Sequence, residues 1–216
     1  MAGRPPLIGI IAAAGSGERL GSDWPKAFVT CGGRPLLDWS LVALAAVCDR
    51  VVVAVPAGMA EGPGRVAGGA SRSESVKAAM LAEPDAAVYV VQDAARPLVT
   101  PELVQRCAAA IADGWDAAVA AAPVSDTIKQ AGPDRRVERT LDRSLLWAIQ
   151  TPQAFSGQAL RRALDVDAAT LAAATDDAAL VEANGGSVTV VEVTEPNLKV
   201  TTAVDLELAE FLLARC

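Results

Sequence analysis

The chain has 216 residues, 52% of them apolar, which is typical of one soluble domain with a sizeable hydrophobic core. Its formal net charge is −7 and no basic stripe is visible, so nucleic acid is not expected as a partner. No stretch has the roughly 18 consecutive apolar residues of a membrane-spanning helix, so a membrane is not expected as a partner either.

Short apolar runs alternate with helical patterns along the chain. Two helices have recognisable start signals. Ser71 and Glu74 have the spacing of a capping box, and Thr100-Pro101-Glu102 supplies a cap residue, a proline at the first position and an early acid. In chain order, we expect strand 7–14, helix 35–48, strand 50–55, helix 71–82, strand 87–91, a helix from 100, strand 117–122, strand 187–193 and helix 202–214.

The first predicted strands are apolar throughout instead of alternating with polar residues. Strands with both faces buried are typical of a parallel sheet that helices cover on each side. The alternation of strands with helices points the same way. Because there is no internal repeat and no long linker, we expect residues 1–216 to form a single α/β domain with a mostly parallel sheet.

Residues 123–150 interrupt this alternation. Segments 127–130 and 135–140 flank the turn-like sequence Ala131-Gly132-Pro133-Asp134, which predicts a hairpin inserted into the α/β core. Such a hairpin is either an ordinary surface feature or an arm that contacts a second subunit.

A glycine-rich segment, residues 12–21, follows the first predicted strand directly. Gly15 and Gly17 let the backbone approach an anion, and successive N–H groups in such a loop form a concavity for phosphate oxygens. Two known motifs do not fit. The dinucleotide fingerprint fails because its third glycine position is Leu20, and the P-loop fails because no lysine follows a glycine at the required spacing. Arg19 and Lys26 add positive charge nearby.

An acidic residue, Asp93, comes just past the predicted strand 87–91, in the segment Gln92-Asp93-Ala94-Ala95-Arg96. Ligands of open α/β sheets bind at the carboxyl ends of the strands. Asp93 is therefore placed to hold Mg²⁺ or to face phosphates, although a turn or cap role is the alternative. Arg96 is either a salt-bridge partner or a contact for substrate phosphate.

The sequence contains no histidine, which excludes a histidine general base and any Ser-His-Asp or Cys-His triad within the chain. Its four cysteines, Cys31, Cys48, Cys107 and Cys216, form no CxxC pair, so a zinc site is not expected. Scattered thiols indicate a reducing compartment, and we expect a cytoplasmic location.

The ordered motifs of the whole chain strongly resemble one family, the 2-C-methyl-D-erythritol 4-phosphate cytidylyltransferases of the non-mevalonate isoprenoid pathway. Any one motif is weak, but the set recurs in order from Ile10 to the last helix. The motifs are residues 12–20 with Pro25-Lys26, Gly68-Gly69 with Arg72, Ser75 and Val76, residues 93–97, residues 122–124 with Asp126-Thr127 and Lys129, residues 141–143, residues 151–153 and residues 197–201.

This resemblance implies a three-layer, Rossmann-like nucleotidyltransferase fold of the GT-A-like kind. It also implies CTP and a small phosphorylated polyol as substrates, Mg²⁺ or another divalent cation as cofactor, and a homodimer whose arms complete the neighbouring active sites. The reaction would transfer CMP from CTP to 2-C-methyl-D-erythritol 4-phosphate and release pyrophosphate.

Roles for individual residues follow from the same resemblance. Catalytic roles fall to Arg19, Lys26, Arg143 and Lys199. Contacts with CTP fall to Ala12, Ala13, Ala14, Gly15, Ser16, Gly17, Gly69, Ala70, Ser75, Asp93 and Ala94. Contacts with the acceptor fall to Asp93, Arg96, Thr127, Arg143 and Lys199, and Asp93 would bind the metal.

Three positions depart from the family pattern. Ala70 stands where an acid is frequent, so a side-chain contact is lost there although backbone contacts can survive. Glu18 replaces a basic residue of some members, and Ser125 replaces an arginine. None of these departures removes a residue assigned to chemistry.

Three other functions stay open at this point. A cytidylyltransferase acting on ribitol 5-phosphate or a similar alditol phosphate would share the donor loops. A dinucleotide-binding oxidoreductase would need a better glycine fingerprint. A non-catalytic nucleotide-binding regulator would bind CTP without releasing pyrophosphate.

Overall fold

In the computed structural model of this chain, the structure describes residues 6–15, 17 and 24–215. The first half alternates strands with helices, as predicted. Its elements are β1 (Leu7–Ala12), η2 (Lys26–Phe28), β2 (Thr30–Cys31), β3 (Arg34–Pro35), α1 (Leu36–Ala45), β4 (Arg50–Val55), η3 (Ala57–Met59), β5 (Arg65–Ala67), α2 (Arg72–Ala82), β6 (Val88–Asp93) and α3 (Pro101–Ala112).

The second half contains the hairpin arm and three consecutive helices that the sequence patterns did not reveal. Its elements are β7 (Ala117–Pro123), β8 (Lys129–Ala131), β9 (Val137–Thr140), η4 (Arg143–Leu145), β10 (Trp147–Ser156), α4 (Gly157–Leu164), α5 (Ala168–Ala173), α6 (Asp177–Ala183), β11 (Val188–Glu192) and α7 (Ala203–Leu213).

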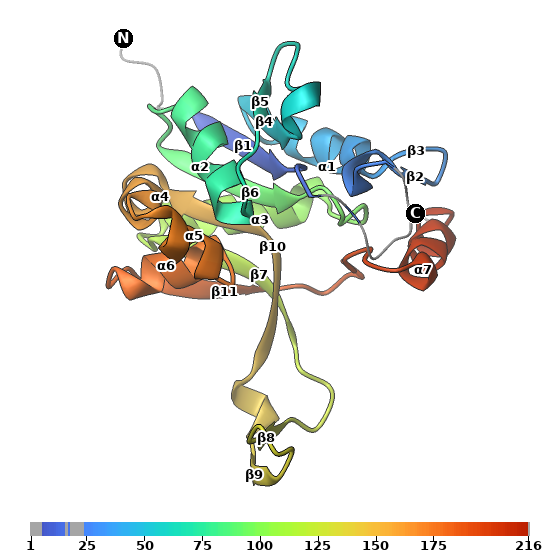
Figure 1. Cartoon of the computed structure of the whole chain (residues 1–216), viewed down its shortest axis with the longest axis vertical. Coiled ribbons are helices and arrows are strands. Elements are labelled where there is room, and N and C mark those ends of the chain that lie inside the picture. The colour runs from blue at the N-terminus through green and yellow to red at the C-terminus, as the bar shows by residue number, and fades with distance from the viewer. Residues whose placement is uncertain (1–5, 16, 18–23, 216) are drawn as a thin grey trace.

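Seven of the described strands form one sheet in the order β11-β7-β10-β6-β1-β4-β5 (Figure 1). The pairs β1–β4, β1–β6, β4–β5 and β7–β11 are parallel. Strand β10 is inserted between β6 and β7 and runs antiparallel to both. The mostly parallel α/β sheet expected from the sequence is therefore confirmed.

Helices cover both faces of this sheet, which gives three layers. Helices α1 and α3 pack on one face, whereas α2, α4, α5 and α6 pack on the other. Neighbouring residues of β1 face opposite sides of the sheet. Ile10 packs against the face covered by α2, α4, α5 and α6, and Ile11 packs against the face covered by α1 and α3. This two-sided burial explains why the parallel strands appear in the sequence as continuous apolar runs.

The predicted helix starts are confirmed for α2 and α3. The Ser71 hydroxyl accepts a hydrogen bond from the Glu74 N–H at 3.2 Å, and the Glu74 carboxylate accepts one from the Ser71 N–H at 2.7 Å. Thr100 caps α3 by accepting from the Leu103 N–H at 3.2 Å, with Pro101 as the first helical residue. Since α2 begins beside the cleft described below, its cap fixes one wall of that cleft.

The hairpin predicted within residues 123–150 is confirmed as β8 and β9, which pair antiparallel beyond the ends of β7 and β10. Figure 1 shows this arm projecting away from the sheet and its helices. Every residue of β8 and β9 is exposed, and the large apolar side chains of Val137 and Leu145 are 55% and 76% exposed.

Within the described residues, no helix is long and apolar enough to cross a membrane.

Leucine truncation provides a test of the core. Leu160 on α4 is fully buried, whereas Leu81 on α2 is 61% exposed. We expect Leu160→Ala to lower the free energy of unfolding by about 2 to 5 kcal/mol, because it removes buried methyl groups and leaves a cavity. Leu81→Ala is the matched control, with an expected change within about 0.5 kcal/mol in chemical denaturation. Equal effects of the two substitutions would contradict the described packing of α4.

Candidate active site

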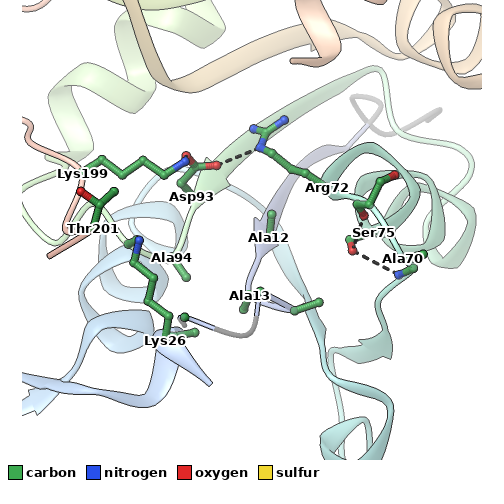
Figure 2. A pocket seen from close by; sticks show the side chains of 17 residues that line it. Ala12, Ala13, Lys26, Ala70, Arg72, Ser75, Asp93, Ala94, Lys199 and Thr201 are labelled. Carbon is green, nitrogen blue, oxygen red and sulfur yellow. Dashed lines mark hydrogen bonds and ion pairs between the residues drawn. The ribbon is translucent and has the colours of Figure 1, made fainter. Parts of the chain in front are cut away.

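A cleft of about 510 Å³ opens at the carboxyl ends of β1 and β6, where open α/β sheets bind their ligands. Figure 2 shows Lys26, Lys199 and Thr201 along one wall, and Arg72, Ser75 and Ala70 along the other. The lining residues are Ala12, Ala13, Ala14, Gly15, Gly17, Lys26, Ala27, Gly69, Ala70, Ser71, Arg72, Ser75, Asp93, Ala94, Ala95, Lys199 and Thr201.

The floor of the cleft comes from the turn that leaves β1. The strand ends at Ala12, so Ala13 and Ala14, predicted as strand residues, belong to this turn. Gly17 has a φ of +78°, and a Cβ there would lie 2.7 Å from the Cβ of Lys26. A side chain at this position would therefore be strained and would collide with Lys26. Ser16 and Arg19, both predicted site residues, lie outside the described residues.

A second glycine turn approaches the first. A Cβ on Gly68 would lie 2.5 Å from the Cβ of Ala14 and 2.8 Å from the hydroxyl of Ser75. The Ser75 hydroxyl accepts from the Gly69 N–H at 3.1 Å and donates to the Ser71 carbonyl at 2.9 Å. Ser75 thus fixes the backbone of residues 69–71, which leaves this turn closely fitted against the floor of the cleft.

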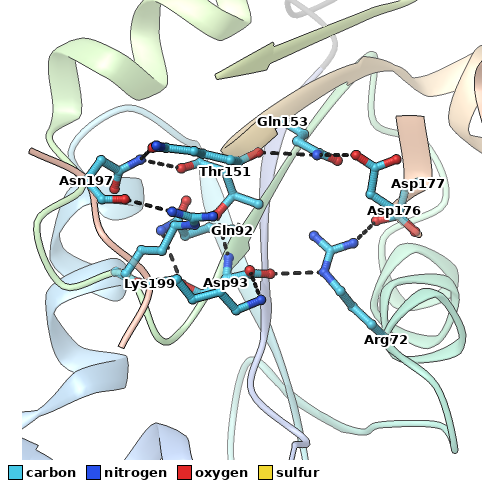
Figure 3. A network of polar contacts seen from close by, with 12 residues as sticks. Arg72, Gln92, Asp93, Thr151, Gln153, Asp176, Asp177, Asn197 and Lys199 are labelled. Atoms are coloured by element: carbon cyan, nitrogen blue, oxygen red, sulfur yellow. Dashed lines mark hydrogen bonds and ion pairs between the residues drawn. The ribbon is translucent and has the colours of Figure 1, made fainter. Parts of the chain in front are cut away.

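The carboxylate of Asp93 lies at the centre of the charged groups (Figure 3). Asp93 was predicted just past a strand ending at residue 91, but β6 continues to residue 93, so Asp93 is its last residue and is 7% exposed. Its Oδ1 accepts from Arg72 Nε at 2.9 Å and its Oδ2 from Lys199 Nζ at 2.7 Å. Its backbone N–H donates to the Thr151 hydroxyl at 3.1 Å, so both the main chain and the side chain are held.

These contacts determine the ionisation of Asp93. Burial alone would raise the pKa of this carboxyl, but the cationic groups of Arg72 and Lys199 outweigh burial and hold the pKa well below its usual range. Burial likewise opposes the charge of Arg72, yet Asp93 and Asp177 keep the pKa of its guanidinium above the ordinary value. Both groups are therefore charged at neutral pH.

Lys199 is presented by a loop that is tied to three parts of the molecule. Arg96 Nη1 donates to the Asn197 carbonyl at 2.7 Å, and Asn197 Nδ2 donates to the Thr151 carbonyl at 2.8 Å. The Thr201 N–H donates to Asp205 Oδ2 at 2.8 Å, which joins the loop to the start of α7. These bonds give Lys199 a fixed starting point from which to reach Asp93.

Some predicted site residues do not line this cleft. Arg96 is 8% exposed and its guanidinium is directed at the loop of Asn197, so the described geometry gives it a role in holding that loop. Thr127 and Arg143 belong to the exposed arm, where Arg143 Nη1 donates to the Ser125 carbonyl. Two residues that line the cleft, Arg72 and Thr201, were recognised as motif members but were not assigned to the site.

The cleft is cationic although the chain is acidic. Lys26, Arg72 and Lys199 line it, and among the described lining residues Asp93 is the single acid. The Ala13 N–H donates to the Ala54 carbonyl at 2.8 Å, whereas Gly15 is exposed and a Cβ there would meet nothing within 4 Å. A site of this kind suits a small ligand with several phosphate groups.

Comparison with known proteins decides the family. The family model described as 2-C-methyl-D-erythritol 4-phosphate cytidylyltransferase matches residues 7–215. This chain belongs to that family.

Relatives of the same name are similar over nearly their whole length. The protein of Frankia casuarinae is 43% identical over 223 residues, which covers 98% of this chain and 83% of the relative. That of Nocardia farcinica is 42% identical and covers 97% of this chain and 94% of the relative. The crystal structure of the Thermus thermophilus protein superposes with a TM-score of 0.79 at 37% identity, covering 96% of this chain and 98% of that one.

The donor set of this cytidylyltransferase cleft suits a cation that arrives with a nucleotide. No group of three or more Asp, Glu or Cys side chains with metal-binding geometry occurs in the described part of the chain. Mg²⁺ needs only one or two carboxylates when substrate phosphates supply its other ligands. Asp93 is such a carboxylate, so the residues present fit a nucleotide-bound Mg²⁺ and do not form a separate metal cage.

The fit between the two glycine turns can be tested in this cytidylyltransferase by adding one methyl group. We expect Gly68→Ala to lower kcat/KM for the nucleotide by about tenfold or more, because the new Cβ must push apart Ala14 and Ser75. Gly58→Ala is the control, since a Cβ at Gly58 meets nothing within 4 Å. Steady-state kinetics that show the same value for both variants would contradict the described contact.

Proposed function

We propose that this protein transfers CMP from CTP to 2-C-methyl-D-erythritol 4-phosphate, releasing pyrophosphate and forming 4-diphosphocytidyl-2-C-methyl-D-erythritol. The observation that supports this most directly is the cationic cleft at the ends of β1 and β6, in a chain that matches the family over residues 7–215. Ribitol 5-phosphate, the alternative acceptor, finds no support in relatives that are named for the methylerythritol substrate.

The reaction joins two anions. An oxygen of the acceptor phosphate attacks the α-phosphorus of CTP, a new P–O bond forms, and the bond to the β-phosphate breaks so that pyrophosphate leaves. The attacking phosphate has its second pKa at about 6, so it is largely dianionic at neutral pH and needs no general base. The absence of histidine from the sequence is consistent with this chemistry.

The residues of the chain overcome repulsion and provide alignment. The loop of residues 12–17 cradles the phosphates of CTP, and Lys26 and Arg19 neutralise charge that develops on them. Gly69, Ala70 and Ser75 contact the cytosine, with Asp93 and Ala94 beside the ribose and phosphates. Lys199 holds the acceptor phosphate in line.

A divalent cation, when bound with CTP, would neutralise phosphate charge, and Asp93 is the residue placed to contact it. The carboxylate oxygens of Asp93 already accept from Arg72 and Lys199. Each oxygen keeps a second lone pair for this contact.

The arm would complete the site of a second subunit. Thr127 and Arg143 lie on an exposed hairpin that carries large exposed apolar residues, which suits a surface covered by a partner. We infer a homodimer in which these two residues contact the acceptor bound to the neighbouring subunit.

The substrate is tested by a panel of acceptors. Purified protein is incubated with CTP, Mg²⁺ and either methylerythritol phosphate or ribitol 5-phosphate, and pyrophosphate release is measured. We expect release with methylerythritol phosphate. A higher kcat/KM for ribitol 5-phosphate would overturn the acceptor assignment but leave the chemistry unchanged.

Lys26 is expected to carry a large share of the barrier reduction. Loss of one positioned electrostatic donor costs about 3 to 4 kcal/mol, so Lys26→Ala should lower kcat by roughly a hundredfold or more while the protein stays folded. Lys77→Ala is the control, because Lys77 does not line the cleft. A folded Lys26→Ala protein with near-normal turnover would remove Lys26 from the mechanism.

The pH profile reports which group must be deprotonated. Because the pKa of Asp93 is well below its usual range, its carboxyl contributes no acid limb above about pH 5. Protonation of the acceptor weakens the nucleophile, so kcat/KM for the acceptor should fall below about pH 6. With a phosphonate analogue, which holds its second proton more tightly, the limb should move to higher pH. A limb that stays in place for both acceptors would assign it to the enzyme or to CTP.

Shared active sites predict subunit complementation. Lys26→Ala and Arg143→Ala homodimers should each be nearly inactive, whereas co-expression should give heterodimers with one intact site and restored turnover. The heterodimers are isolated by a different tag on each subunit. If their turnover is not restored, Lys26 and Arg143 of one subunit act in the same active site.

A further inference from the structure

A buried carboxylate outside the cleft, Asp177, contacts the charged centre from behind. Asp177 is the first residue of α6 and has no exposed surface. Its Oδ2 accepts from Arg72 Nη1 at 2.6 Å, and its Oδ1 has no hydrogen-bond partner among the described residues. It does not line the cleft, and no role was assigned to it from the sequence.

Stability alone is a weak explanation for this charge. Burying an ion pair costs desolvation that the attraction between the charges often fails to recover. The start of α6 does not need this acid either, because the preceding residue, Asp176, already caps the helix by accepting from the Ala179 N–H at 2.9 Å. The contact with Arg72 therefore calls for another explanation.

Four alternating charges cross the site in one line (Figure 3). Asp177 binds Arg72 at 2.6 Å, Arg72 binds Asp93 at 2.9 Å, and Asp93 binds Lys199 at 2.7 Å. The four residues come from α6, the start of α2, the end of β6 and the loop before α7. Loss of Asp177 is therefore expected to alter the position of Arg72, and through Asp93 the position of Lys199.

The geometry of the guanidinium shows what Asp177 prevents. An arginine can bind a carboxylate through two parallel hydrogen bonds, one to each oxygen. Here Asp177 anchors the guanidinium of Arg72 at Nη1, which fixes the orientation in which Nε reaches Oδ1 of Asp93 while Oδ2 is bound by Lys199. Without this anchor the guanidinium can turn until Nε and Nη2 take both oxygens of Asp93 and displace Lys199.

We propose that Asp177 is a positioning residue for the transfer reaction: it restrains Arg72 so that Asp93 keeps one oxygen for Lys199. This inference rests on the proposed function, in which Lys199 holds the acceptor phosphate. It assigns to Asp177 an effect on acceptor alignment and not on binding of CTP.

The test compares two neighbouring acids in the purified enzyme. Asp177→Asn keeps the size of the side chain but loses its charge. We expect kcat to fall on the order of tenfold to a hundredfold, KM for the acceptor to rise and KM for CTP to stay near the wild-type value. Asp176→Asn is the control at the same helix start: asparagine keeps the cap on the Ala179 N–H and does not touch Arg72, and it loses only the hydrogen bond that Asp176 Oδ2 accepts from Gln153 Nε2 at 2.9 Å. The control should keep wild-type kinetics.

Repeating the Asp177→Asn substitution in an Arg72→Lys protein tests whether the effect depends on two-pronged binding by arginine. Lysine cannot bind a carboxylate in the two-pronged manner of arginine. In an Arg72→Lys protein, the further change Asp177→Asn should therefore cost much less than it does beside Arg72. Should Asp177→Asn not fold, Asp177→Glu replaces it, since one added methylene shifts the guanidinium while the charge stays, and the same split between kcat and KM for CTP is expected.

Wild-type kinetics in Asp177→Asn, an equal loss in Asp176→Asn, or an equal loss in both backgrounds at position 72 would overturn the inference. A uniform rise in KM for both substrates would do the same, because it indicates general damage to the fold. Failure of the wild-type protein to release pyrophosphate from CTP would instead refute the proposed function.

Discussion

The carboxylate of Asp93, held between Arg72 and Lys199, is the contact on which the arrangement of the cleft depends. It joins residues from the start of α2, the end of β6 and the loop before α7, which are far apart in the sequence. The fold keeps this carboxylate charged, because the two cations outweigh the effect of burial on its pKa. A neutral residue at this place would leave two cations close together with no anion between them.

The groups around this contact reduce the electrostatic repulsion between the two substrates. Two phosphorylated molecules must meet, and the chain as a whole carries a net charge of −7. The positive charge is therefore local, since Lys26, Arg72 and Lys199 line the cleft. Since these groups are held by the sheet ends and helix caps, little reorganisation is needed when the anions arrive.

Much of the fold could be predicted from local sequence patterns. Buried parallel strands appear as apolar runs, and the starts of α2 and α3 carry residues that cap helices through short-range hydrogen bonds. Strand β10 was missed because its residues Thr151 and Gln153 are polar yet buried, which breaks both the apolar and the alternating pattern. Helices α4 to α6 are 8, 6 and 7 residues long, and such short helices give little periodicity.

The site was predicted in part for similar reasons. Gly15, Lys26 and Asp93 lie in short segments whose composition points to phosphate binding, and they do line one cleft. The bond between Arg72 and Asp177 joins residues 105 positions apart, and no local pattern marks such a pair. No local pattern marks the contact of Arg96 either: its sequence context fits a phosphate contact, but its guanidinium donates to the Asn197 carbonyl.

The most direct test of the central claim is a crystal structure of this protein with CTP and Mg²⁺ bound. We expect the triphosphate to lie on the backbone of residues 12–17, next to Lys26, with its α-phosphorus facing Lys199 and the pair Asp93–Arg72 intact. Phosphates bound away from the glycine turn, or a cleft in which Asp93 has lost both cations, would contradict it.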